Sequence, residues 1–340
     1  VLMMFHRQPG QLDKELAEMD ECMPHYYRIT NGHGQGAEKI MAAEAAFLQG
    51  RFDDAHIALE QAYAQIQGNG QMNMALCCDF LAWRLTPYTG AAPRYTFQQR
   101  RGVLMQHHNT DWLHILDATC AYYHALLGQP EKIPAVFREH QLSSINYLAP
   151  GKPMMEMIEN QVYLAQGSYA KVIGRSEGLL AMCGAMHYAL VALHIRIQTA
   201  AAYEMLGKHD ESRALLAQAL SDAAPDGFLL PFAENYRYLS PLLHQGSTAP
   251  APQIIALGEA AEARLRQTAR PEALAALTER EHEIVELMTQ RLSNREIAEK
   301  LFLTEGSVKQ YVKQIYSKLH IEGDTRTKRR QLSELLETKT

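Results

Sequence analysis

The sequence predicts an all-α protein in which a series of helical hairpins precedes a separate four-helix domain. Leucine, alanine, glutamine, glutamate and methionine are abundant and β-branched runs are scarce, which favours helices over strands. Glycines recur at a nearly fixed interval over most of the 340 residues. Near the C-terminal end, two hydroxyl residues each precede a glutamate by three positions, a pattern typical of helix starts.

The hairpins are predicted from the register of seven glycines, whose successive gaps are 38 to 40 residues: Gly10, Gly50, Gly90, Gly128, Gly167, Gly207 and Gly246. Several share their flanks, as in "AAFLQGRFDDA", "VYLAQGSYAKV" and "AYEMLGKHDES". Glycine accepts the left-handed conformation that ends a helix, so a second helix can turn back. We therefore expect an α-solenoid of hairpins of about 40 residues over residues 1–246. A chance alignment among 21 glycines is the alternative, and the shared flanks argue against it.

The domain boundaries follow from composition. "STAPAPQ" after Gly246 predicts a linker with a short helix over residues 247–274, and the last domain then occupies residues 275–340. At the other end, "VLMMFHRQPG" supplies only the last turns of a helix before Gly10. We therefore expect the chain to be a fragment of a polypeptide that continues N-terminally.

Four helices are predicted in the last domain from their N-caps. "TERE" (278–281) and "SNRE" (293–296) are capping boxes, and Thr304 and either Asp324 or Thr325 would begin the other two helices. The third helix has one apolar stripe: Val308, Val312, Ile315 and Leu319.

The opposite face of the third helix carries two cations and two amides and no carboxylate: Gly306, Lys309, Gln310, Lys313, Gln314 and Ser317. Lysine can contact guanine or phosphate, and glutamine can pair with adenine. The helix N-terminus, with Thr304 and Ser307, can donate to a phosphate. The alternative interpretation is the solvated face of an ordinary helical hairpin.

The whole stretch "LTEREHEIVELMTQRLSNREIAEKLFLTEGSVKQYVKQIYSKL" (277–319) closely resembles the LuxR-type helix-turn-helix. Region 4 of a sigma factor is the main look-alike, and "LSN" with the match through the third helix favours the LuxR type. The resemblance implies base contacts from Lys309, Gln310 and Lys313. It implies contacts to the DNA backbone from a second set: Arg295, Thr304, Ser307, Gln314 and Lys318.

The chain departs from the LuxR-type pattern at several positions. Tyr311 stands where the family has histidine, and Gln314 where it has asparagine. "HIEGDTRTKRR" is longer than usual before Arg326, and Arg329 replaces a small residue. These departures concern the phosphate contacts and the dimer surface of the fourth helix.

The first domain resembles a larger class of regulators. Its repeats are similar to tetratricopeptide repeats, whose usual period is 34. "DGFLLPFAENYRYLSPLL" (226–243) resembles the segment that ends the repeats of the large MalT-like, ATP-binding regulators. That resemblance implies an ATPase upstream, with no cofactor in this chain, and repeats that bind a small-molecule inducer or a regulatory protein. It also implies that the protein acts as an activator in the bacterial cytoplasm. In that role it would self-associate on double-stranded promoter DNA and contact RNA polymerase.

Composition limits the other possible functions. The net charge of −5 gives no global sign of DNA binding, although residues 275–340 hold 12 Lys and Arg against 11 Asp and Glu. The five scattered cysteines indicate a reducing compartment, and no nucleotide loop, catalytic constellation or metal-ligand set is apparent. We expect no enzyme and no membrane span. The rival function is a repeat scaffold for protein partners with an accessory or non-functional DNA-binding tail.

Overall fold

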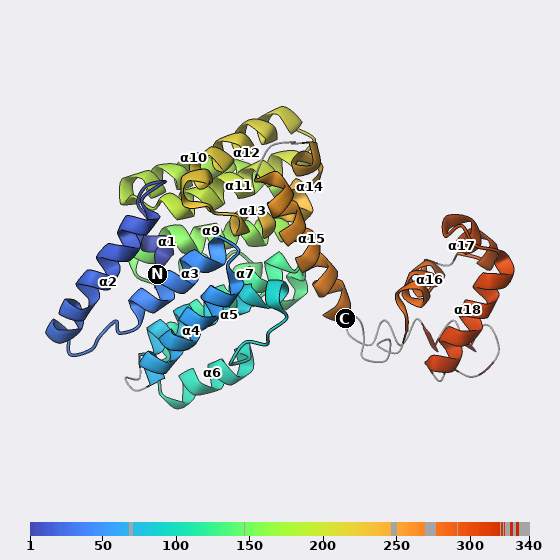
Figure 1. Cartoon of the computed structure of the whole chain (residues 1–340), viewed down its shortest axis with the longest axis horizontal. Coiled ribbons are helices and arrows are strands. Elements are labelled where there is room, and N and C mark those ends of the chain that lie inside the picture. The colour runs from blue at the N-terminus through green and yellow to red at the C-terminus, as the bar shows by residue number, and fades with distance from the viewer. Residues whose placement is uncertain are drawn as a thin grey trace. The chain divides into compact units, whose positions relative to one another are not determined.

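The computed structural model describes residues 1–67, 71–145, 147–245, 250–268, 277–290 and 292–319, and also 321, 323, 327, 328, 331 and 332. The chain divides into two compact units, Val1–Arg264 and Leu265–Thr340 (Figure 1). All regular elements among the described residues are helices, which confirms the all-α prediction. No helix of this described part combines the length and apolar character that crossing a membrane requires.

The first unit contains fifteen α-helices among its described residues, with 3-10 turns between some of them. Their bounds are α1 Leu2–Phe5, α2 Leu12–Ile29, α3 Ala37–Leu48, α4 Phe52–Gln67, α5 Met72–Thr89, α6 Phe97–Gln106, α7 Leu113–Leu126, α8 Ala135–Arg138, α9 Lys152–Ala165, α10 Tyr169–Met186, α11 Ala189–Met205, α12 His209–Ala223, α13 Leu230–Ala233, α14 Tyr236–Gln245 and α15 Ala251–Thr268.

The glycine register marks left-handed backbone positions, as predicted. The φ angles lie between 65° and 78° at six of the seven positions: Gly10, Gly50, Gly90, Gly128, Gly167 and Gly207. The seventh, Gly246, lies outside the described residues. In the hairpins α3–α4, α9–α10 and α11–α12, the residue after the glycine donates to the carbonyl five positions back, as Ser168 does to Tyr163 (2.8 Å).

Gly10 differs from the prediction that it ends a helix. α1 already ends at Phe5, and Gly10 lies in the connection to α2. Its amide donates to Asp226 Oδ2 (2.6 Å), and the amide of Leu12 donates to Asp226 Oδ1 (3.0 Å). The side chain of a residue from the other end of the unit therefore caps α2, a role that no local signal predicts.

The C-terminal segment of the first unit crosses the glycine-terminated ends of three helices. Leu229 N donates to Leu48 O (2.7 Å) at the end of α3. Arg264 donates to Pro87 O (3.2 Å) near the end of α5, and Arg237 donates to Leu127 O (3.4 Å) after α7. Helix ends leave carbonyls without intrahelical partners, and this segment satisfies them.

These contacts change the expected architecture. Each repeat of an open solenoid contacts only its neighbours, whereas here residues 225–245 and 250–264 contact the helix ends at Gly50, Gly90 and Gly128 as well as the last hairpin. α15 lies in the stretch expected to be a linker, but Ile254 near its start is fully buried, and the first unit extends to Arg264. Most of α15 thus belongs to the first unit, where a linker was expected.

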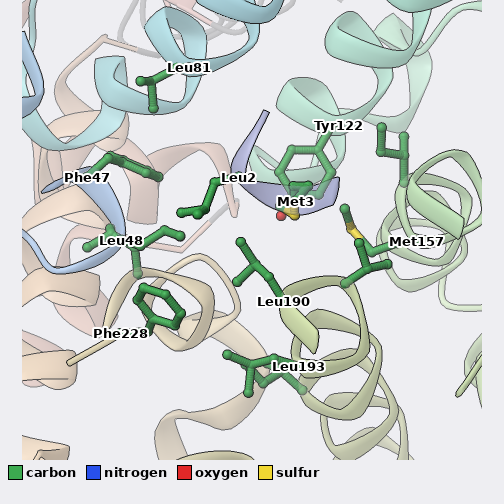
Figure 2. Close-up of a cluster of buried hydrophobic side chains, with 14 of the residues drawn as sticks. Leu2, Met3, Phe47, Leu48, Leu81, Tyr122, Met157, Leu190, Leu193 and Phe228 are labelled. Carbon is green, nitrogen blue, oxygen red and sulfur yellow. The ribbon is translucent and has the colours of Figure 1, made fainter. Parts of the chain in front are cut away.

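The core of the first unit surrounds α1. Leu2 and Met3 are buried, and α1 contacts α3 and α11. Figure 2 shows these two side chains among apolar residues from α3, α5, α7, α9 and α11: Phe47, Leu48, Leu81, Tyr122, Met157, Leu190 and Leu193. Side chains from helices far apart in the sequence therefore share one apolar interior.

A buried ion pair lies within this interior. Arg84 of α5 donates twice to Glu234, through Nε (2.7 Å) and Nη2 (2.9 Å), and Tyr122 donates to the same carboxylate (3.0 Å). The Arg84 guanidinium also lies 4.8 Å from the centre of the Phe47 ring. Burial alone would lower the pKa of Arg84, but Glu234 raises it, so the guanidinium stays charged.

Candidate nucleic-acid interface

Three capped helices account for most of the described part of the second unit: α16 (Glu279–Thr289), α17 (Asn294–Lys300) and α18 (Glu305–Lys318). Thr278 and Ser293 form the two predicted capping boxes, with Glu281 and Glu296 as their partners. Thr304 caps α18 by accepting from Ser307 N (3.1 Å). All three N-caps were predicted correctly because capping is a local interaction.

The apolar faces of these helices meet in one small core. Its buried members include Ile284, Val285 and Met288 of α16, Ile297 and Ala298 of α17, and Val308, Ile315, Tyr316 and Leu319 of or next to α18. Val312 is partly buried against it, so the predicted stripe on α18 faces inward. The core fixes which face of α18 remains outside.

Two hydrogen bonds from charged side chains, one of them an ion pair, hold α16 against the other helices. Arg280 Nη2 donates to Leu301 O (2.7 Å) at the end of α17. Lys318 Nζ, at the end of α18, donates to Glu281 Oε2 (2.6 Å). Burial alone would raise the pKa of Glu281, but the hydrogen bonds from Lys318 and Thr278 hold it below its ordinary value. The α16 capping box therefore also anchors α18.

The connection between α17 and α18 is short and tightly fixed. Leu303 N donates to Ala298 O (2.9 Å), and Leu301 and Leu303 pack against the core. Between them, Phe302 adopts a φ of 53° and its side chain is 97% exposed. Two helices joined by so tight a turn, with the second presenting an exposed polar face, define a helix-turn-helix.

The exposed face of α18 contains the predicted base-contacting residues. Gly306, Lys309, Gln310, Lys313, Gln314 and Ser317 are all exposed. Lys309 Nζ lies 2.7 Å from Glu305 Oε1, one turn earlier on the helix. The bond to Lys309 lowers the pKa of Glu305. A carboxylate therefore reaches the edge of a face that was expected to carry none.

Lys313, Gln310 and Gln314 differ from Lys309 in having no side-chain partner among the residues that the structure describes. Positions four apart share a helix face, so the pairs 309/313 and 310/314 form two adjacent rows. Lys313 is the cation of this face that is not already engaged with a carboxylate.

The predicted backbone-contacting residues have different environments. The hydroxyls of Thr304 and Ser307 are 2.9 Å apart, and only one proton lies between them, so the other hydroxyl proton can reach a phosphate. Arg295 pairs with Glu299 at 3.2 Å on the surface of α17. Gln314 is exposed, whereas the ammonium of Lys318 is directed to Glu281. A pair separated by 37 residues has no sequence signal, so the internal role of Lys318 was missed.

The predicted fourth helix falls mostly outside the described residues. Asp324, Thr325, Arg326 and Arg329 are among those that are not described. Tyr311, which replaces the usual histidine, is partly buried against the core of the unit.

Comparisons with known proteins assign the sequence of the helix-turn-helix to a family. Residues 275–329 match the family described as bacterial regulatory proteins, luxR family. The chain is also similar to Transcriptional regulatory protein LnrK of Bacillus subtilis (strain 168), with 36% identity over 120 residues, or 33% of this chain and 54% of that relative. The chain thus spans about half the length of the curated relative it matches. No solved structure matches it.

The second unit therefore carries a luxR-family helix-turn-helix domain, as the resemblance predicted. The family match covers the three described helices and their turn. The roles of individual residues on α18 stay predictions.

Proposed function

We propose that the chain is a transcriptional regulator that binds double-stranded promoter DNA through α18. The observation that carries the proposal is the exposed row of lysines and glutamines on a helix whose other face is fixed in the core. The family of the domain and the name of the relative support it. In the proposed complex α18 enters the major groove, where Lys309, Gln310 and Lys313 contact base edges.

In this proposal the DNA backbone is held from both ends of the helix-turn-helix. Thr304 and Ser307 donate to one phosphate from the N-terminus of α18, where the helix dipole favours an anion. Arg295 and Gln314 contact neighbouring phosphates. Lys318 adds positive potential while it remains bonded to Glu281.

We further propose that the first unit is the sensor of a MalT-like regulator with tetratricopeptide-like hairpins, acting on the DNA-binding unit. Three of its hairpins share a left-handed glycine and the same backbone hydrogen bond after it, which supports the repeat relationship. Its signal would be a small-molecule inducer or a regulatory protein. Self-association on DNA and contact with RNA polymerase complete the proposed activator mechanism, and an ATPase would lie in another part of the full-length protein.

The test is DNA binding by the whole chain, with oligonucleotides selected from a random pool. The double variant Lys309→Ala/Lys313→Ala should lose affinity and lower the slope of log K against log salt by about two, because each phosphate or base contact by a cation releases a counterion. Lys300→Ala, an exposed lysine of α17 outside the proposed set, is the matched control. Equal losses in both variants would contradict the assignment of α18.

The scaffold alternative makes a different prediction in the same experiment. If the C-terminal domain does not recognise a DNA sequence, no sequence in the pool should be enriched above its starting frequency. A selected sequence that competes with random DNA would rule that alternative out.

A further inference from the structure

A cavity in the first unit brings together several chemically active side chains that the DNA-binding role does not use. Its volume is about 290 Å³, at the lower end of the range for small-molecule sites. It lies between the connection from α1 to α2 and the helices α10, α11 and α12.

One side of this cavity is apolar and the other carries charge. Leu180, Leu193, Tyr188 and Phe228 supply apolar surface. Arg196 Nη1 is bonded to Asp222 Oδ2 at 2.8 Å, so these two charges largely neutralise each other. The guanidinium of Arg7 has no partner among the described residues, although the Arg7 backbone amide donates to Glu15. Arg7 is therefore the cation available to a ligand.

The cavity wall is firmly held. His6 is buried, with Nδ1 2.8 Å from Glu15 and Nε2 3.5 Å from Asp226. The carbonyl of His6 accepts a hydrogen bond from Ala189 N (3.0 Å), which fixes the connection after α1 to the start of α11. Arg7 thus projects from a braced segment.

A strained residue lies at the same place. His187 lines the cavity and adopts a φ of 55° at the turn between α10 and α11. Glycine occupies the left-handed position in the turns of α3–α4, α9–α10 and α11–α12. A side chain that replaces glycine there costs on the order of 1 kcal/mol, and such residues concentrate at functional sites.

Two other hollows of the described chain fit a ligand less well. One of about 400 Å³ lies beside α2 and shares Arg7 with the first cavity, but its lining also includes the carboxylates Glu15 and Glu18, which would repel an anionic ligand. The other, of about 140 Å³, has half the volume, and both arginines of its lining are already paired, Arg94 with Glu60 and Arg100 with Asp79.

We propose that the cavity beside Arg7 binds a small aromatic carboxylate. The ring packs against Leu193 and Phe228, and the carboxylate accepts hydrogen bonds from the Arg7 guanidinium, a charge-assisted pair. Interpreting this ligand as the signal of the sensor unit rests on the proposed function, but the binding event itself does not.

The first test uses benzoate as the probe and benzyl alcohol as its uncharged counterpart, with ligand-observed NMR on the whole chain. Benzoate should bind at millimolar concentration and benzyl alcohol more weakly, because only benzoate can pair with Arg7. Equal binding of both, or no binding of benzoate, would overturn the proposal.

The second test places a bulky side chain in the cavity wall. Gly184 lines the cavity, and a Cβ there meets no atom within 4 Å, so Gly184→Leu adds apolar bulk at the lining from a position with room for its first side-chain atom. Gly178 of the same helix is equally open but lies outside the lining, so Gly178→Leu is the matched control. Benzoate binding should be lost in Gly184→Leu and retained in Gly178→Leu; retention in both would overturn the site.

A third pair of variants tests the charge. Arg7→Ala should weaken benzoate binding on the order of tenfold, the effect of losing a hydrogen bond to a charged group. Arg213→Ala removes an exposed arginine of α12 that does not line the cavity, and should change nothing. Since none of these variants touches α18, failure here would leave DNA binding intact, whereas failure of the DNA-binding proposal would leave benzoate binding intact.

Discussion

At the scale of single residues, the two lysines of the α18 face are not equivalent. Lys309 already has a carboxylate neighbour in Glu305, whereas Lys313 has none among the described residues. The four-residue spacing of Glu305 and Lys309 could be read from the sequence as a possible helix pair, but whether the two side chains meet depends on their rotamers. Exposed pairs of this kind are weak, so DNA can displace Glu305.

Replacing Glu305 should therefore strengthen DNA binding. Glu305→Gln removes a carboxylate that repels phosphate and competes for Lys309, and affinity should rise by roughly two- to fivefold at low salt. Fluorescence anisotropy with the selected DNA measures the change. Glu283→Gln, which removes an exposed carboxylate of α16, should have a smaller effect; an equal rise would show only a change in net charge.

The stability of the second unit should depend on pH through Glu281. Its pKa is lower in the folded protein than in the unfolded chain, so its contribution is fully present above the unfolded pKa and is lost as pH falls through the folded value. Thermal unfolding followed between neutral and acidic pH should show this loss. The profile of Glu281→Gln should be flatter, and a profile parallel to wild type would contradict the role of Glu281.

At the scale of elements, helix ends were predictable because their signals are local. The capping hydroxyls and the register glycines each act within about five residues of their own position. The ends of α3, α5 and α7 were predictable for the same reason. Their outer contacts, from Leu229, Arg264 and Arg237, come from distant sequence and could not be foreseen.

The conformational role of the register glycines can be tested with two matched substitutions. Gly207 has a φ of 72° and Gly174 lies inside α10, and a Cβ at either position meets no atom within 4 Å. Gly207→Ala should lower the free energy of unfolding by about 1 kcal/mol, and Gly174→Ala should raise it by about 0.5–1 kcal/mol. Denaturant titration of the first unit measures both; changes of the same sign would contradict the left-handed assignment.

At the scale of the whole chain, the predicted and observed structures agree on the hairpins and differ in how those hairpins are arranged. The repeats were visible as a period in the sequence. The packing of the last helices of the unit on its early hairpins depends instead on pairs such as Arg84 and Glu234, which are 150 residues apart. The luxR-type domain was predictable over its described length because its motif is contiguous. The cavity beside Arg7 was not, because its lining comes from four separate stretches of the chain, near residues 6–9, 180–196, 222 and 228.

Breaking the buried ion pair should destabilise the entire first unit. Glu234→Gln leaves the Arg84 guanidinium without its charge partner in the interior, at a cost of about 3–5 kcal/mol. The melting temperature of the first unit should fall sharply. The double variant Arg84→Met/Glu234→Leu should recover part of the loss, since no buried charge then remains; a double variant as unstable as the sum of the single ones would argue against a coupled pair.

The contacts of residues 225–245 and 250–264 with earlier hairpins also limit how this protein could evolve. Open repeat arrays tolerate the gain or loss of a unit because each new repeat needs only its neighbours. Here an inserted or deleted hairpin between Arg84 and Glu234 would shift the two partners by a whole repeat and separate Asp226 from Gly10. The number of hairpins is thus constrained by contacts between the two ends of the unit, because a chain with one hairpin more or fewer could not form them all.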